Sequence, residues 1–362
     1  MAKISSSAYL LGLSLIPGLG PARIKILQQH FPDPAEVWGL SEKSLRALKL
    51  PEGVASSILE YRKKIDLEGE LAKLSKAAIK IITLLDDDYP PLLREIYDPP
   101  PVLYVRGNLR PLAPKIAVVG TRLMTVYGHQ VTESLTRDLV GTGLTIVSGL
   151  ARGVDAMAHR TALAAGGETI AVLGSGLNQV YPPENKHLAE EIAQQGAVIS
   201  EYPPAVEAAR GTFPARNRII SGLSLGVVVT EAGEDSGSLI TANSAAEQGR
   251  LVFSVPGPVN SRQSAGANSL IKVGAKLVTS TEDILDELNL AEKIVPQEMV
   301  AIKPANSTEG KILETLTAEP THFDDLVRTT KLPAGKLGSA LTVMVISGKV
   351  ADLGGNFYAR NH

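Results

Sequence analysis

The chain has 362 residues, of which 44% are hydrophobic and 20% charged, as in a globular protein larger than one average domain. Only 4% are aromatic, so the core must be aliphatic and extended aromatic platforms for stacking bases are not expected. A net charge of -2 excludes a globally basic nucleic-acid binder, and the lack of cysteine excludes disulfides and thiolate metal sites. No apolar run reaches the roughly 18 residues of a membrane span, and no signal peptide is recognisable, so we expect a soluble, cytoplasmic protein without membrane contact.

Residues 1–75 predict a small domain of short helices. Residues 13–27 place a Pro-Gly-Leu-Gly turn between two apolar helical patterns, and residues 50–59 form a weaker second copy. This pattern resembles a helix-hairpin-helix or SAM-like module, which in many proteins holds DNA phosphates through turn amides. The same hairpin also serves protein packing, so DNA contact stays open here.

Residues 76–109 predict a linker with an edge strand. The segments 86–93 and 98–105 are broken by proline and cannot lie inside a helix. Residues 102–107 form a short strand pattern that leads into the next domain.

Residues 110–290 alternate between apolar runs, glycine turns and helical patterns. The runs are almost continuously apolar, as in parallel strands covered on both faces. The pattern predicts an α/β fold, an extended Rossmann-like doubly wound sheet that is mostly parallel. The expected strands are 116–120, 145–148, 169–174, 197–200, 226–230, 251–255 and 275–278, and the expected helices include 126–140, 155–165 and 239–248.

Residues 291–307 are a polar, proline-containing linker, and residues 308–362 form a separate unit. Three short helical patterns, a strand, a Gly-Gly turn and a second strand predict a winged-helix-like domain. Its third helix has few basic residues, so DNA reading, protein contact and simple packing all stay open.

Glycine-containing loops with arginine, serine or asparagine follow several of the expected strands. Ligands of open α/β sheets bind outside the carboxyl ends of the strands, where such loops expose amides and helix N-termini to anions. A single glycine is often turn chemistry, and a single arginine is often a surface residue, but five such loops together favour a polyanion site. The cations that we expect there are Arg122, Arg152, Lys186, Arg216 and Arg218.

Several familiar sites are missing from the sequence. There is no Gly-x-x-x-x-Gly-Lys-Ser/Thr loop, and the first strand ends in Gly-Thr-Arg rather than Gly-x-Gly-x-x-Gly. Asp155 and His159 share a helix face, and we interpret them as structural because no nucleophile accompanies them. The six histidines are dispersed, so we expect neither a metal nor a cofactor.

Six motifs in order resemble those of the bacterial DNA-processing protein A family, also called DprA or Smf. They cover residues 120–122, 148–155, 181–185, 213–222, 236–241 and 255–257, and the resemblance spans roughly residues 80–285. It implies a non-enzymatic protein that binds and protects single-stranded DNA and loads the RecA recombinase onto it in natural transformation and homologous recombination. It also implies a homodimer joined through the Rossmann-like domain, with residues 270–277 near the contact.

By the same resemblance, Arg122 and Lys186 are expected to contact DNA. Residues 213–222 are expected as a loop in which Arg216, Asn217 and Arg218, together with Arg152, either touch DNA or brace the pocket. The full expected set for single-stranded DNA or phosphate is Gly120, Thr121, Arg122, Ser148, Gly149, Arg152, Gly174, Asn185, Lys186, Phe213, Arg216, Asn217, Arg218, Ser236, Gly237 and Ser238.

The alternative is a nucleotide-binding enzyme or sensor. Related Rossmann-like phosphoribohydrolases use a Pro-Gly-Gly-x-Gly-Thr loop with a nearby Arg-Glu pair. Residues 231–238 read Glu-Ala-Gly-Glu-Asp-Ser-Gly-Ser, so the catalytic pattern does not carry over.

Overall fold

The structure is a computed structural model that describes residues 4–48, 50–51, 53–290, 307–317, 320–346 and 349–360. The chain divides into two units, Met1–Gln297 and Glu298–His362. The N-terminal helices belong to the first unit together with the sheet, and the expected domain boundary near residue 75 stays a prediction.

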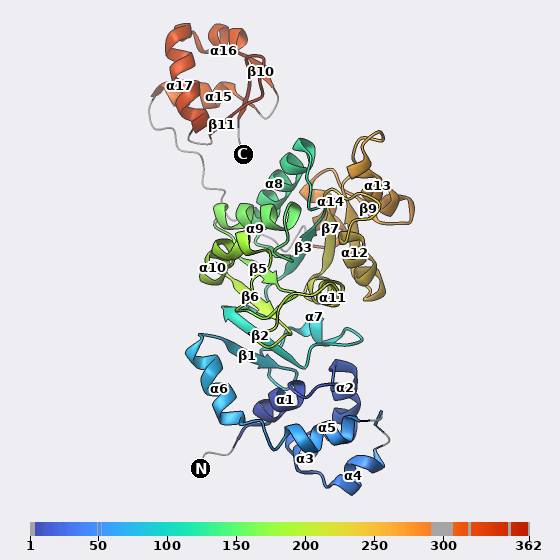
Figure 1. Ribbon diagram of the computed structural model, residues 1–362. Coiled ribbons are helices and arrows are strands. Elements are labelled where there is room, and N and C mark those ends of the chain that lie inside the picture. The colour runs from blue at the N-terminus through green and yellow to red at the C-terminus, as the bar shows by residue number, and fades with distance from the viewer. Residues whose placement is uncertain are drawn as a thin grey trace. The chain divides into compact units, whose positions relative to one another are not determined.

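A nine-stranded sheet forms the first unit (Figure 1), in the order β1-β2-β6-β5-β4-β3-β7-β8-β9. From β6 to β9 all neighbours are parallel, whereas β2 is antiparallel to both β1 and β6. The run β5-β4-β3-β7-β8-β9 has the 3-2-1-4-5-6 order of a doubly wound fold, with β6 added outside β5. The predicted fold class is confirmed. The strands are β1 Lys80–Thr83, β2 Val102–Gly107, β3 Lys115–Val119, β4 Thr145–Ser148, β5 Thr169–Val172, β6 Ala197–Ser200, β7 Gly226–Val229, β8 Leu251–Ser254 and β9 Lys276–Leu277.

Helices cover both faces of the sheet, which explains why the strands are apolar at consecutive positions. Ile116 and Val118 of β3 face a core shared with α8 (Val126–Gly141), α9 (Val154–Ala164) and α14 (Thr281–Glu287). Ala117 and Val119 face the opposite core, shared with α11 (Thr212–Gly222), α12 (Ser238–Glu247) and α13 (Ala265–Lys272). The alternation along one strand follows from its two-residue period.

The segment 213–222 is helix α11, so its prediction as a loop is wrong. Pro214 lies in the first turn, where its missing N–H has no partner to lose, and Gly222 ends the helix. Ile219 and Ile220 are buried against the sheet. The sequence contained these start and stop signals of a helix, but the cluster of arginine and asparagine favoured interpretation as a ligand-binding loop.

The segment expected as a linker holds more structure than predicted. It contains β1, the short helix α7 (Pro91–Arg94) and β2. The edge position predicted for residues 102–107 is wrong, because β1 pairs outside β2 and takes the edge itself. Leu10 and Leu11 of α1 (Ser6–Ser14) share a core with Val102 and Tyr104 of β2, so the N-terminal helices pack on this end of the sheet. The other N-terminal helices are α2 Pro21–His30, α3 Pro34–Gly39, α4 Glu42–Ala47, α5 Val54–Tyr61 and α6 Leu67–Lys76, and α10 (Lys186–Gln195) follows β5.

The second unit has the predicted winged-helix order. Helices α15 (Ser307–Thr315), α16 (Phe323–Thr330) and α17 (Ala334–Ile346) accompany a sheet of order β10-β12-β11. Here β10 is Thr321–His322, β11 is Val350–Asp352 and β12 is Phe357–Arg360. Gly354 and Gly355 adopt positive φ in the turn between β11 and β12. In the part of the chain that the structure describes, no helix has both the length and the apolar character needed to cross a membrane.

Candidate anion-binding cleft

A cleft of about 1020 Å³ opens at the carboxyl ends of β3 and β7, where the strand order reverses direction. Loops after these strands, the beginnings of α11 and α12, and the loop before α13 line it. From the predicted set, it brings together Gly120, Thr121, Arg122, Phe213, Arg216, Asn217, Ser236, Gly237 and Ser238. Gly149 and Arg152 line a smaller hollow that shares Arg122, Phe213 and Arg216 with the cleft.

Arg216 is the buried base of the cleft, with only 5% of its surface exposed. Its guanidinium donates to the carbonyl oxygens of Gly149 and Val172 and, through Nε, to Oδ1 of Asn217 at 3.1 Å. A Cβ at Gly149 would come within 2.6 Å of this guanidinium, so the close approach requires glycine. Burial lowers the pKa of Arg216 to about 10, and nearby Asp155 opposes this, so the residue stays a cation at neutral pH.

The Gly-Thr-Arg loop is held in place by buried backbone contacts. The Thr121 N–H donates to the Glu231 carbonyl at 2.7 Å, and the Val154 N–H donates to the Thr121 carbonyl at 3.1 Å. Gly153 has a φ of +72°, and a Cβ there would come within 2.2 Å of the Thr121 oxygen. The Glu231 carboxylate accepts from the Thr125 N–H and hydroxyl at 2.9 and 2.6 Å. The loop that carries Arg122 is therefore fixed on both sides.

The mouth of the cleft combines exposed cations with two aromatic rings. Arg122, Arg210 and Arg262 are exposed and line the cleft. The rings of Tyr181 and Phe213 lie 5.6 Å apart, and the Arg122 guanidinium lies 5.7 Å from the Phe213 ring centre. This small aromatic site differs from the expectation based on the low aromatic content. Exposed Glu234 and Asp235 also line the cleft, so the cleft carries both positive and negative side chains.

Three predicted residues brace the loops behind the cleft. The Ser148 hydroxyl donates to the Val118 carbonyl at 2.7 Å, and the Asn185 amide donates to the Leu150 carbonyl at 2.9 Å. Both side chains are buried. At Gly174 a Cβ would meet the Phe213 ring at 3.0 Å, so this glycine lets α11 come close to β5.

Three of the predicted cations do not line the cleft as Arg122 does. Lys186 is exposed at the start of α10 and does not line either hollow. Arg218 is bonded to Glu201 and Asp98 and does not line them either. Arg152 lies at the smaller hollow but is bonded to the Glu184 carboxylate, which offsets its charge.

Asp155 and His159 both make structural contacts. The Asp155 carboxylate accepts from the Gly149 and Ala151 N–H groups at 3.1 and 3.3 Å. His159 is fully buried, its Nδ1 lies 2.6 Å from the Thr169 hydroxyl, and burial lowers its pKa to about 3. It is therefore neutral at physiological pH. Among the described residues, no group of histidine and acidic side chains could hold a metal ion.

Sequence reasoning missed Arg210 and Arg262 as cleft residues. Arg210 lies three residues before Phe213, and Arg262 begins a short 3-10 helix, Arg262–Ser264, between β8 and α13. Neither belongs to a recognisable motif. Only the fold brings them to the same opening as Arg122.

Two family models match the chain. The model described as DNA recombination-mediator protein A matches residues 80–289, and the model described as DprA winged helix domain matches residues 296–356. Protein Smf of Synechocystis sp. is 36% identical, with 98% of this chain and 99% of that protein covered. DNA processing protein DprA of Bacillus subtilis is 46% identical, with 60% of this chain and 74% of that protein covered.

Two solved structures have a similar fold. DNA processing protein A from Streptococcus pneumoniae has a TM-score of 0.67 and 39% identity, with 79% of this chain and 98% of that chain covered. The protein from Helicobacter pylori has a TM-score of 0.54 and 32% identity, with 60% of this chain and 97% of that chain covered. That structure concerns the single-stranded DNA binding mode of the H. pylori protein.

Proposed function

Because the chain belongs to the DNA recombination-mediator protein A family, we propose that it binds single-stranded DNA in the cleft, protects the strand and loads RecA onto it. The observation that carries the proposal is the meeting of Arg122, Arg210 and Arg262 with the Tyr181 and Phe213 rings at one opening. A single strand exposes both phosphates and base faces, and this opening offers a partner for each. The similarity to the H. pylori protein, whose structure concerns single-stranded DNA binding, adds support.

The role that we propose for each residue of the site follows from the exposure of its side chain. The three exposed arginines would hold phosphates, and the N-terminal ends of α11 and α12 would add backbone N–H groups. A base would stack beside Phe213 and Tyr181, where the Arg122 guanidinium already covers one ring. Lys186 would contact the strand further along, outside the cleft. Buried Arg216, Asn217, Ser148 and Asn185 would hold the site in shape.

The affinity should tolerate changes of base sequence and fall steeply with salt. With three phosphates neutralised by the arginines and a fourth by Lys186, the logarithm of the binding constant should fall against the logarithm of salt concentration with a slope of about -3. Titration of a labelled strand at several salt concentrations measures this slope. A flat dependence would remove phosphate contact as the basis of binding.

We propose that the protein acts without catalysis and needs no cofactor. Support comes from Asp155 and His159, the one acid-base pair that the motifs suggest, which are both held in structural contacts. A nucleotide derivative that is hydrolysed in the presence of the protein would contradict this.

RecA loading and strand protection extend the proposal to partners. The protein should shorten the lag before RecA hydrolyses ATP on strands coated with a single-strand-binding protein, and it should slow nuclease digestion of a bound strand. Both activities place it in the cytoplasm, where RecA acts. An unchanged lag and an unchanged digestion rate would confine the role to binding.

We also propose a homodimer through residues 110–290. Val273 and Leu277, at the β9 edge of the sheet, are 81% and 50% exposed, which suits a contact between copies. Light scattering of the full chain at micromolar concentration should give twice the mass of one chain, and a monomeric mass would contradict the dimer. A dimer would present two clefts to one strand and so raise the overall affinity.

A further inference from the structure

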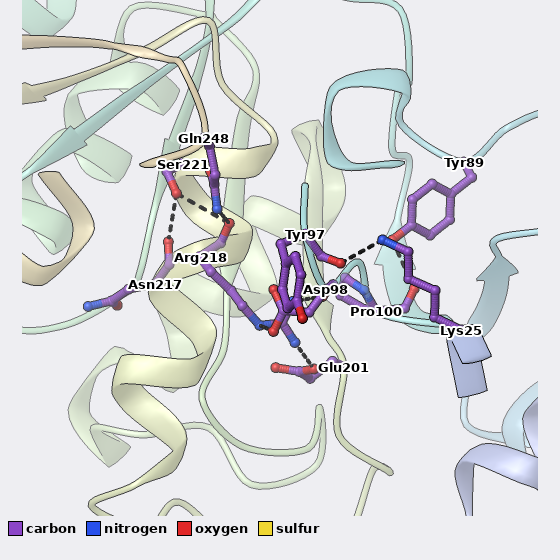
Figure 2. A network of polar contacts seen from close by, with 10 residues as sticks. All are labelled: Lys25, Tyr89, Tyr97, Asp98, Pro100, Glu201, Asn217, Arg218, Ser221 and Gln248. Carbon is purple, nitrogen blue, oxygen red and sulfur yellow. Dashed lines mark hydrogen bonds and ion pairs between the residues drawn. The ribbon is translucent and has the colours of Figure 1, made fainter. Parts of the chain in front are cut away.

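Arg218 follows the cleft residues Arg216 and Asn217 on α11 but does not line the cleft, and its side chain points toward Asp98 and Glu201 (Figure 2). Its guanidinium donates to the Asp98 carbonyl at 2.8 Å, lies 3.2 Å from the Asp98 carboxylate and bonds the Glu201 carboxylate. The Arg218 side chain is only 13% exposed and that of Glu201 only 9%. Arg218 therefore joins α11 to the segment before β2 and to the residue after β6.

The ion pair between Arg218 and Glu201 is buried and therefore hard to separate. Burial raises the pKa of Glu201, and the Arg218 cation opposes that rise. A buried carboxylate without its cation is strongly unfavourable, so the pair resists separation. From the other side, the Gln248 amide after α12 donates to the Arg218 carbonyl at 3.0 Å.

The same segment also holds the N-terminal helices. Lys25 of α2 donates to the Tyr97 carbonyl at 2.7 Å, and its ammonium lies 5.6 Å from the Tyr97 ring centre. Tyr97 and Asp98 are consecutive, so α2 bonds one residue through Lys25 and α11 bonds the next through Arg218. The Tyr89 hydroxyl fixes the segment further by donating to the Pro100 carbonyl at 2.8 Å (Figure 2).

We propose that Asp98 and Arg218 are positioning residues for the cleft, and that the Tyr97–Asp98 bridge couples the N-terminal helices to it. The bridge holds α11, and α11 carries Phe213, Arg216 and Asn217 into the cleft. A preformed site binds more tightly because less freedom is lost on binding. The effect on DNA rests on the proposed function, but the effect on α11 does not.

The first test is Asp98→Asn, which removes the carboxylate that pairs with Arg218. It leaves in place the buried Arg218–Glu201 pair and the hydrogen bond from Arg218 to the carbonyl oxygen of residue 98. Removing a negative charge from a protein that binds a polyanion normally strengthens binding. The bridge predicts the opposite, a weakening of single-strand binding by roughly threefold to tenfold. The matched control is Asp88→Asn, an exposed residue of the same segment, which should not weaken binding. Equal or tighter binding by Asp98→Asn would overturn the proposal.

The second test is Lys25→Met, which removes the hydrogen bond from α2 to the Tyr97 carbonyl. Binding should weaken while the salt slope stays unchanged, because a lost phosphate contact would reduce the slope by about 0.7. The double variant with Asp98→Asn should be no weaker than the more affected single variant, since both act through one bridge. Additive losses with a reduced slope would make Lys25 a DNA contact instead. Exposed Lys63→Met controls for charge on the N-terminal helices.

The third test needs no DNA. Hydrogen–deuterium exchange of α11 amides in the free protein should be faster in Asp98→Asn than in Asp88→Asn, with α8 amides unchanged. Unchanged exchange in α11 would overturn the bridge. If the wild type binds no single strand, the proposed function fails, and this exchange experiment still decides whether the bridge supports α11.

Discussion

Replacing Arg216 by methionine should lower the free energy of unfolding of the first unit by about 3–5 kcal/mol. The change removes the donor of two carbonyl oxygens, those of Gly149 and Val172, and the cation beside buried Asp155. Methionine fills part of the volume but supplies neither charge nor hydrogen bonds. The stability of the Gly149 loop and of the cleft base therefore depends on this one side chain.

Urea unfolding followed by tryptophan fluorescence measures this loss. Trp38 is the chain's one tryptophan and lies in α3, so the signal reports the unit that contains the cleft. Arg210→Met is the matched control, because Arg210 is exposed and should leave the midpoint close to that of the wild type. Coincident midpoints for Arg216→Met and Arg210→Met would show that Arg216 does not stabilise the fold.

Arg122→Ala should weaken single-strand binding by about tenfold to a hundredfold, corresponding to about 1–3 kcal/mol. The change removes a cation that would bind phosphate, and it also removes the guanidinium that packs against the Phe213 ring beside the base. Because Arg122 is exposed, the fold should stay intact. The salt slope should also fall by about 0.7.

Two other variants put this result in context. Arg152→Ala serves as a matched control, because Glu184 already offsets the Arg152 charge and the loss should be small. Lys186→Ala should also weaken binding, but less than Arg122→Ala, because Lys186 lies outside the cleft. An affinity of Arg122→Ala equal to that of the wild type at low salt would remove Arg122 from the site.

The sequence predicted the sheet well because the strands have one strong signal. Runs such as residues 226–230 are short, rich in β-branched residues and apolar at consecutive positions, as expected for strands covered on both faces. Residues 213–222 were misread because polar residues on one side of α11 masked the apolar pair Ile219–Ile220 on the other. The edge strand β1 was missed because just one of its four residues is buried, whereas all four residues of β4, a strand of the same length, are buried.

The candidate site could be predicted only as far as its motifs reach. The Gly-Thr-Arg loop directly follows β3, and the Ser-Gly-Ser segment lies in the connection between β7 and α12, so their place at the carboxyl edge of the sheet follows from topology. An arginine can line the cleft or pair with a carboxylate elsewhere, and residues distant in the sequence decide which of these it does. Arg216 and Arg218 are two residues apart, yet one forms the base of the cleft and the other is bonded to Asp98, 120 residues away.

Single-strand binding in the cleft is tested most directly by fluorescence anisotropy of a labelled single strand of about 30 nucleotides titrated with the wild-type protein. Duplex DNA and free nucleotides serve as competitors. We expect tight binding that neither competitor displaces, because the cleft needs phosphates and exposed base faces on one strand. Weak strand binding that a free nucleotide displaces would contradict it and would identify the cleft as the site of a nucleotide enzyme or sensor.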